Sequence, residues 1–163
     1  MLRIDEPGER IPLTIADSET VRGTITIIFQ VAGDTTRQLS TLNTGDYLLD
    51  IVGPLGHPTH IENYGTAVCV GGGLGIALVM PIVQALHDAG NHVISIISAR
   101  NKDLLICEKE MEAYSKEFLI ATDRDMEVPA HMNALWLLPF QQHVFPESDI
   151  SHAMALAEKY IGR

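Results

Sequence analysis

CVGGGLGIALVMP, residues 69–81, places four glycines between two apolar runs. The apolar run before the glycines is typical of a buried strand, and the run after them is typical of a helix. Because glycine has no Cβ, a glycine cluster lets the backbone turn tightly or approach a ligand closely. The stretch therefore predicts a strand, loop and helix whose loop is either a ligand site or a plain tight turn.

The chain from residue 66 onward repeats this alternation. TAVCV, HVISII and FLIAT, which begin at residues 66, 92 and 118, are nearly continuous apolar runs, as expected for parallel strands buried on both faces. LVMPIVQALHDAG and KDLLICEKEMEAYSKE, which lie between them, are helix-like, and the second has apolar residues at three- and four-residue spacing. This half of the chain predicts a parallel α/β sheet.

Pro81 indicates where the first helix starts. Proline lacks an N–H group and is tolerated in the opening turn of a helix, so we expect the helix to begin near Leu78 and to stop at Gly90. Residues 71–77 would then connect the carboxyl end of a strand to the amino end of a helix. Open parallel sheets bind anionic groups at such a connection.

The first half of the chain has shorter, β-like segments. IPLTIA (11–16) and GTITIIFQV (23–31) predict an antiparallel hairpin, DTTRQLSTLN (34–43) a short helical turn, and YLLDIV (47–52) a third strand. At the other end of the chain, NALWLLPF (133–140) predicts a further strand and ESDISHAMALAEKYIGR (147–163) a capped helix. We thus expect an α/β protein with antiparallel sheet first and parallel sheet second.

Composition excludes several classes of function. The 163 residues carry a formal net charge of −10, which disfavours general binding to nucleic acid or to anionic membranes. The apolar stretch after the glycines is too short to span a bilayer, and the first ten residues lack a signal-peptide core, so we expect a cytoplasmic protein. The seven histidines are scattered, and two cysteines cannot supply a four-thiolate cluster, so we expect no metal site.

Considered one by one, the candidate binding residues fit either a ligand site or an ordinary structural role. The glycine loop fits neither G-x-G-x-x-G nor the P-loop, and Arg100 after the second parallel strand suits a ribose phosphate, a pyrophosphate or plain solvent. Hydroxyls and guanidinium groups near strand ends in the first half suit a phosphate or a flavin edge, but they also suit turn capping. These residues are Arg10, Thr14, Thr35, Thr36 and Arg37.

Four segments together are similar to a known family. GERIPLTIAD, GTITIIFQVAGDTTRQLSTLNTGDYLLDIVGPLGHPT, CVGGGLGIALVMPI and SARNKDLLICEKEM, in this order, resemble the ferredoxin-NADP reductase superfamily. Within it they resemble the small, alpha subunits of NADH-dependent reduced ferredoxin:NADP oxidoreductases, also called sulfide dehydrogenase subunits, and the electron-transfer subunits of dihydroorotate dehydrogenases. The similarity extends from about Leu2 to Asp123, and residues 124–163 do not match.

The resemblance implies two cofactor sites. The segment RIPLT would lie along the flavin ring of FAD, with Thr14 as the catalytic contact to its polar edge, and the glycine loop would hold the pyrophosphate of NAD or NADP. The implied flavin residues are Arg10, Pro12, Leu13, Thr14, Gln30, Val31, Thr35 and Thr36. The implied nicotinamide dinucleotide residues are Gly71, Gly72, Gly73, Leu74, Gly75, Arg100 and Asp123.

The expected organisation follows from the same resemblance. Residues 1–64 would form a shortened FAD-binding barrel-like domain, and residues 65–163 an NAD(P)-binding α/β domain. The expected function is that of an oxidoreductase electron-transfer subunit that passes a hydride between NAD(P)H and FAD, without an iron-sulfur cluster in this chain. A larger subunit or a second copy would cover the barrel edge. The alternative is a truncated, non-catalytic nucleotide-binding or structural remnant of the same family.

Overall fold

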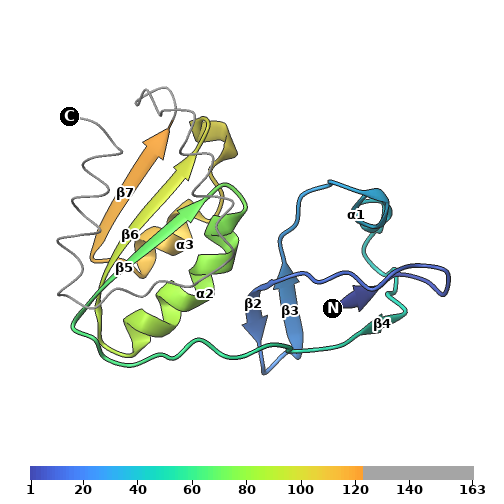
Figure 1. Cartoon of the computed structure of the whole chain (residues 1–163), viewed down its shortest axis with the longest axis horizontal. Coiled ribbons are helices and arrows are strands. Elements are labelled where there is room, and N and C mark those ends of the chain that lie inside the picture. The colour runs from blue at the N-terminus through green and yellow to red at the C-terminus, as the bar shows by residue number, and fades with distance from the viewer. Residues whose placement is uncertain (123–163) are drawn as a thin grey trace. The chain divides into compact units, whose positions relative to one another are not determined.

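The computed structural model describes residues 1–122 and divides the chain into two compact units, Met1–Pro58 and a second that begins at Thr59 (Figure 1). The predicted strand at 133–140, the predicted helix at 147–163 and the candidate residue Asp123 lie outside the described residues. Antiparallel ribbons form the first unit and a parallel sheet with helices forms the second, so the predicted fold class is confirmed.

The first unit contains two separate two-stranded antiparallel ribbons. Strand β1 (Leu2–Arg3) pairs with β4 (Asp50–Ile51), and β2 (Ile15–Glu19) pairs with β3 (Thr24–Ile27). The predicted hairpin is therefore present, but its first strand begins four residues later than the IPLTIA segment. The predicted strand at 47–52 is reduced to β4, whose partner β1 was not expected. The short helix α1 (Asp34–Leu39) lies where a helical turn was predicted.

Few side chains are buried in the first unit. Its buried apolar residues are Leu2, Ile4 and Ala16, whereas Val21 and Tyr47 are 93% and 89% exposed. An isolated two-stranded ribbon is at best marginally stable in water without further strands or a packed apolar face. The described part of this unit thus offers apolar surface for further packing.

Within the described residues, the second unit contains a three-stranded parallel sheet with strand order β5-β6-β7. β5 (Thr66–Gly72) connects through α2 (Gly75–Asp88) to β6 (His92–Ala99), and the 3₁₀ helix η1 (Lys102–Leu104) and α3 (Glu108–Ala113) lead to β7 (Glu117–Thr122). The predicted alternation of strands and helices in this half is confirmed. Gly90 follows the end of α2, as the sequence predicted.

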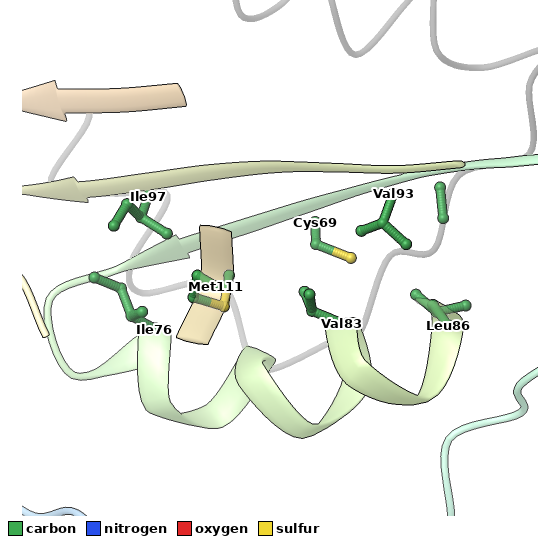
Figure 2. Close-up of a cluster of buried hydrophobic side chains, with 8 residues drawn as sticks. Cys69, Ile76, Val83, Leu86, Val93, Ile97 and Met111 are labelled. Atoms are coloured by element: carbon green, nitrogen blue, oxygen red, sulfur yellow. The ribbon is translucent and has the colours of Figure 1, made fainter. Parts of the chain in front are cut away.

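One face of this sheet packs against both helices. Side chains alternate between the faces of a strand, so Cys69 of β5 and Val93 and Ile97 of β6 point the same way, toward Val83 of α2 and Met111 of α3 (Figure 2). These residues are buried, and burial raises the pKa of the Cys69 thiol to about 11, so that this cysteine acts as a small apolar core residue. The core fixes the carboxyl end of β5 against the start of α2.

The predicted start of the first helix is wrong. α2 begins at Gly75 rather than near Leu78, and Pro81 lies inside it. Proline removes one intrahelical hydrogen bond, but the earlier start buries Ile76 and Ala77 completely. Burial of these two side chains is the physical reason that we assign to the longer helix. The connecting loop is consequently short.

The predicted single helix at 102–117 is also wrong. η1 and α3 are separated at Cys107, which has a left-handed φ of 53°. Leu105, Ile106 and Cys107 all pack against the core. Three consecutive residues cannot share one face of a continuous helix, so the chain leaves the helical path where these partly buried residues pack against the core.

Candidate functional site

The glycine loop lies at the carboxyl edge of the parallel sheet. Gly72 of β5 pairs in register with Ser98 of β6, and the N–H of Gly73 donates to the carbonyl oxygen of Ser98 at 2.8 Å. Gly73 has a φ of 49°, a left-handed conformation that suits glycine. The loop is thereby fastened to the end of β6, and Arg100 follows that strand directly.

Two glycines of the loop differ in their surroundings. A Cβ added to Gly71 would lie 3.0 Å from the Cα and 3.3 Å from the nitrogen of Ile76, so glycine at this position lets β5 and α2 approach closely. Within the described residues, a Cβ added to Gly75 would meet no heavy atom within 4 Å apart from its chain neighbours and the backbone of its own helix. Gly71 is therefore needed for packing, whereas space is open beside Gly75.

The amino end of α2 presents backbone donors. The N–H groups of Ile76 and Ala77 donate to the carbonyl oxygens of Gly73 and Leu74 at 3.2 and 3.1 Å. Within residues 1–122, the N–H groups of Leu74 and Gly75 have no hydrogen-bond acceptor. Because the positive end of the helix dipole adds to these donors, this end of α2 is suited to an anionic group. Arg100 is exposed at the same sheet edge.

The segment RIPLT of the first unit begins as a third strand beside β1. The backbone N–H and carbonyl groups of Ile11 exchange hydrogen bonds with those of Leu2, both at 3.0 Å. Along the rest of the segment, Pro12 and Thr14 are exposed and Leu13 is half-buried. Thr14 is thus an exposed residue that a ligand can reach.

The other implied flavin residues lie at and before α1. Gln30 and Val31 are exposed, and Thr35 is half-buried in the first turn of the helix. The Thr36 hydroxyl accepts from the N–H groups of Ala32 and Gly33, each at 3.0 Å, and donates to the carbonyl oxygen of Gly33. Thr36 therefore caps the turn, which is the alternative role that the sequence left open for it.

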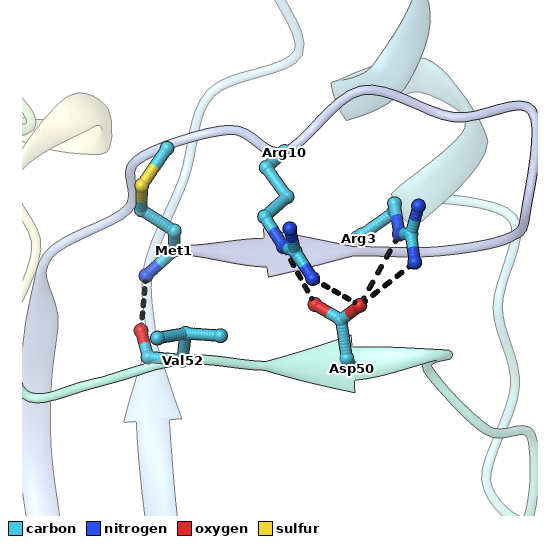
Figure 3. Close-up of polar contacts among 5 residues, drawn as sticks. All are labelled: Met1, Arg3, Arg10, Asp50 and Val52. Atoms are coloured by element: carbon cyan, nitrogen blue, oxygen red, sulfur yellow. Dashed lines mark hydrogen bonds and ion pairs between the residues drawn. The ribbon is translucent and has the colours of Figure 1, made fainter.

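A carboxylate that the sequence analysis did not select organises the first unit. Asp50 of β4 accepts from Arg10 Nε at 3.0 Å and Nη2 at 2.8 Å, and it also pairs with Arg3 across the ribbon (Figure 3). The hydrogen bond from Arg10 is the main cause that lowers the pKa of the Asp50 carboxyl, and the same bond raises the pKa of Arg10. The sequence signal that could have indicated a role for Asp50 was its place as an acid inside the apolar segment YLLDIV.

Two features are absent from the part of the chain that the structure describes. No helix within residues 1–122 is long and apolar enough to cross a membrane. In the same residues, no three histidine, cysteine, aspartate or glutamate side chains gather in a way that could hold a metal ion.

Comparison with known proteins shows similarity to electron-transfer subunits, although no family model matches the chain. A Thermotoga maritima homolog of the electron transfer subunit of dihydroorotate dehydrogenase B (NAD(+)) is 46% identical over 123 residues, which cover 76% of this chain and 44% of the relative. The corresponding Streptococcus pneumoniae subunit is 26% identical over 77% of this chain and 50% of its own length.

A solved structure has the same fold. In the NADH-dependent reduced ferredoxin-NADP oxidoreductase, one chain is 36% identical to this protein and superposes with a TM-score of 0.73; the match covers 96% of this chain and 50% of that one. The chain belongs to the ferredoxin-NADP reductase-like family. It spans about half the length of the relatives that it matches. The suspected family is thus confirmed.

Both units of the chain contain a segment that resembles the ferredoxin-NADP reductase-like family. Two of the relatives are named as electron-transfer subunits of an NAD(+)-linked dehydrogenase, and the solved relative is an oxidoreductase that depends on NADH. The glycine loop and the RIPLT segment, which resembled this family in the sequence, lie at a sheet edge and on an exposed ribbon of the structure.

Proposed function

We propose that this chain is part of a flavin-dependent oxidoreductase and that it passes a hydride between NAD(P)H and FAD as an electron-transfer subunit. The single observation that carries the proposal is the 46% identity to a homolog of such a subunit. The open backbone donors at the start of α2 and the exposure of Thr14 support it from the structure.

In this proposal the second unit holds the nicotinamide dinucleotide. The N–H groups of Leu74 and Gly75 donate to the pyrophosphate, and the open space beside Gly75 leaves room for it. Gly71, Gly72 and Gly73 shape the loop, and Arg100 neutralises negative charge at the same edge. The donor set fits an anionic dinucleotide, because an N-terminal helix end and a guanidinium both favour negative charge. Asp123, the last implied residue, is proposed on the resemblance alone.

The first unit holds the flavin in the same proposal. Thr14 contacts the polar edge of the ring, Pro12 and Leu13 lie along its face, and Gln30, Val31, Thr35 and Arg10 hold the remainder of FAD. Thr36 contributes by fixing the turn before α1, since its hydroxyl is already bonded to that turn. Bound FAD would supply the hydride chemistry, and the residues of this chain would bind and orient it.

A partner would complete the first unit. The first unit buries few residues and exposes apolar side chains such as Val21 and Tyr47. Exposed apolar surface and unpaired strand edges both favour contact with another chain. We propose a larger oxidoreductase subunit, or a second copy of this chain, as the partner. The same small core favours the second candidate function, a non-catalytic remnant that retains only the nucleotide-binding half.

The visible absorption spectrum tests the proposed function. The purified chain, supplied with FAD and then with NADH under anaerobic conditions, is expected to show protein-bound flavin bands that bleach when NADH is added. A chain that takes up no FAD but is protected by NADH in thermal melts would support the nucleotide-binding remnant. Failure to bind either cofactor would contradict both candidate functions.

Replacement of Thr14 with valine tests the flavin half of the site. Valine keeps the shape of threonine but lacks the hydroxyl, so the Kd for FAD is expected to rise about tenfold, as for loss of a hydrogen bond to a polar ring edge. FAD fluorescence titration measures the change. Thr26→Val in β3, an exposed threonine outside the proposed site, is the matched control. An unchanged Kd in Thr14→Val would remove Thr14 from the site.

A further inference from the structure

We infer that Asp50 is a positioning residue for the flavin segment: it holds the Arg10 guanidinium, and through it the start of RIPLT, in the arrangement that binds the cofactor. The inference rests on the proposed function and extends it to a residue that does not itself touch the flavin.

The first step is the order of three chain segments. β1 lies between β4 on one side and the Ile11 bridge on the other, because Leu2 pairs with both Ile51 and Ile11. Arg10 therefore has to reach across β1 to contact Asp50 on the far strand (Figure 3). This single contact joins residues 40 positions apart.

The second step is the geometry of the contact. Arg10 uses Nε and Nη2 against the two different carboxylate oxygens of Asp50, at 3.0 and 2.8 Å. Such a two-point contact fixes the plane of the guanidinium as well as its position. Arg3 Nε and Nη2 approach Asp50 Oδ2 at 3.2 and 3.1 Å, which anchors the carboxylate from the opposite residue of β1.

The third step is charge. Two guanidinium groups surround one carboxylate, so the cluster retains a net positive charge in a chain whose formal net charge is −10. Asp50 thus orients Arg10 and cancels only one of the two positive charges of the arginines. Ile11 follows Arg10 directly and is bonded to β1, so the orientation of Arg10 and the path of Pro12, Leu13 and Thr14 are set together.

The experiment compares Asp50→Asn, Arg10→Lys and the double variant in the full-length chain. Asparagine removes the charge, and lysine keeps its charge but loses the planar fork. Each single variant is expected to raise the Kd for FAD about tenfold and to alter the shape of the bound-flavin absorption bands. Because Asp50 acts through Arg10, the double variant is expected to lose no more than either single one.

Two further variants separate positioning from a general loss of folding. Asp50→Glu keeps the carboxylate and is expected to recover part of the affinity, and Glu19→Gln removes a carboxylate from the hairpin of the same unit and is expected to bind FAD like the wild type. NADH-induced thermal shifts report on the second unit and should be the same in every variant. Partial recovery in Asp50→Glu also keeps the test valid if Asp50→Asn does not fold.

Each contrary outcome has a distinct meaning. Wild-type affinity and spectrum in Asp50→Asn, losses that add in the double variant, or an equal loss in Glu19→Gln would each overturn the positioning role while the proposed function stands. A wild-type chain that binds no FAD would overturn the flavin part of the proposed function and this inference with it.

Discussion

Replacement of Gly75 with alanine is expected to weaken NADH binding at least about tenfold while leaving the chain as stable as the wild type or more stable. Among residues 1–122, the added methyl group meets no atom of another segment within 4 Å, so it would occupy the open space in which we propose the pyrophosphate lies. Alanine in place of glycine in a helix contributes about 0.5–1 kcal/mol of stability. Binding and stability should therefore change in opposite directions.

Gly71→Ala is the matched variant and should behave differently. Its methyl group would lie 3.0 Å from the Cα of Ile76, which is buried backbone that cannot move freely. Forcing β5 and α2 apart is expected to cost about 1–3 kcal/mol of unfolding free energy, with a loss of NADH binding as a consequence. Thermal melts with and without NADH measure both quantities for the two variants.

The pair of variants distinguishes a binding loop from a tight turn. If the loop only connects β5 to α2 and NADH binds elsewhere, Gly75→Ala should keep the wild-type NADH affinity, since the added group meets no other segment of residues 1–122 within 4 Å. Undiminished NADH protection in Gly75→Ala, together with a loss in Gly71→Ala, would therefore contradict the proposed dinucleotide site and leave packing as the role of the glycines.

The parallel half of the fold was predictable because its signals are local. Continuous apolar runs, which are typical of parallel strands, mark β5, β6 and β7 in the sequence, although Val70 of β5 and Leu119 of β7 are exposed in the structure. The position of the glycine loop at the carboxyl edge of the sheet follows from that order alone. Helix bounds were less predictable, because the burial of Ile76 and the packing of residues 105–107 against the core depend on the assembled fold.

The first unit shows what the sequence alone does not reveal. The pairing of β1 with β4 joins segments far apart in the chain, and nothing near either segment specifies the partner. The role of Asp50 could not be predicted for the same reason. An acid in a short strand is typical of exposed surface, and only the folded chain brings Arg3 and Arg10 to it. Thr36 was selected from the sequence, but its role could not be predicted. A hydroxyl near a helix start suits a cap and a ligand equally, and the structure shows the capping bonds.

The largest expected effect on stability comes from Ile97→Ala in the middle of β6. Ile97 is fully buried and lies with Ile76 and Met111 in the cluster between the sheet and α2 (Figure 2). Removing its three carbon atoms leaves a cavity that the packed strand and helix cannot close, so we expect a loss of about 2–5 kcal/mol. Urea unfolding of the full-length chain, without cofactor, measures the free energy of unfolding.

Leu119→Ala in β7 is the control, because Leu119 pairs with Ile96 and therefore points to the opposite face of the sheet, where it is 47% exposed. Truncation of a half-exposed side chain is expected to cost about 0.5 kcal/mol or less. A small effect of Ile97→Ala would contradict the position of the core between the sheet and its helices. Equal effects of the two variants would instead mean that both faces of the parallel sheet are packed in the folded protein, as the continuous apolar runs of the sequence predict.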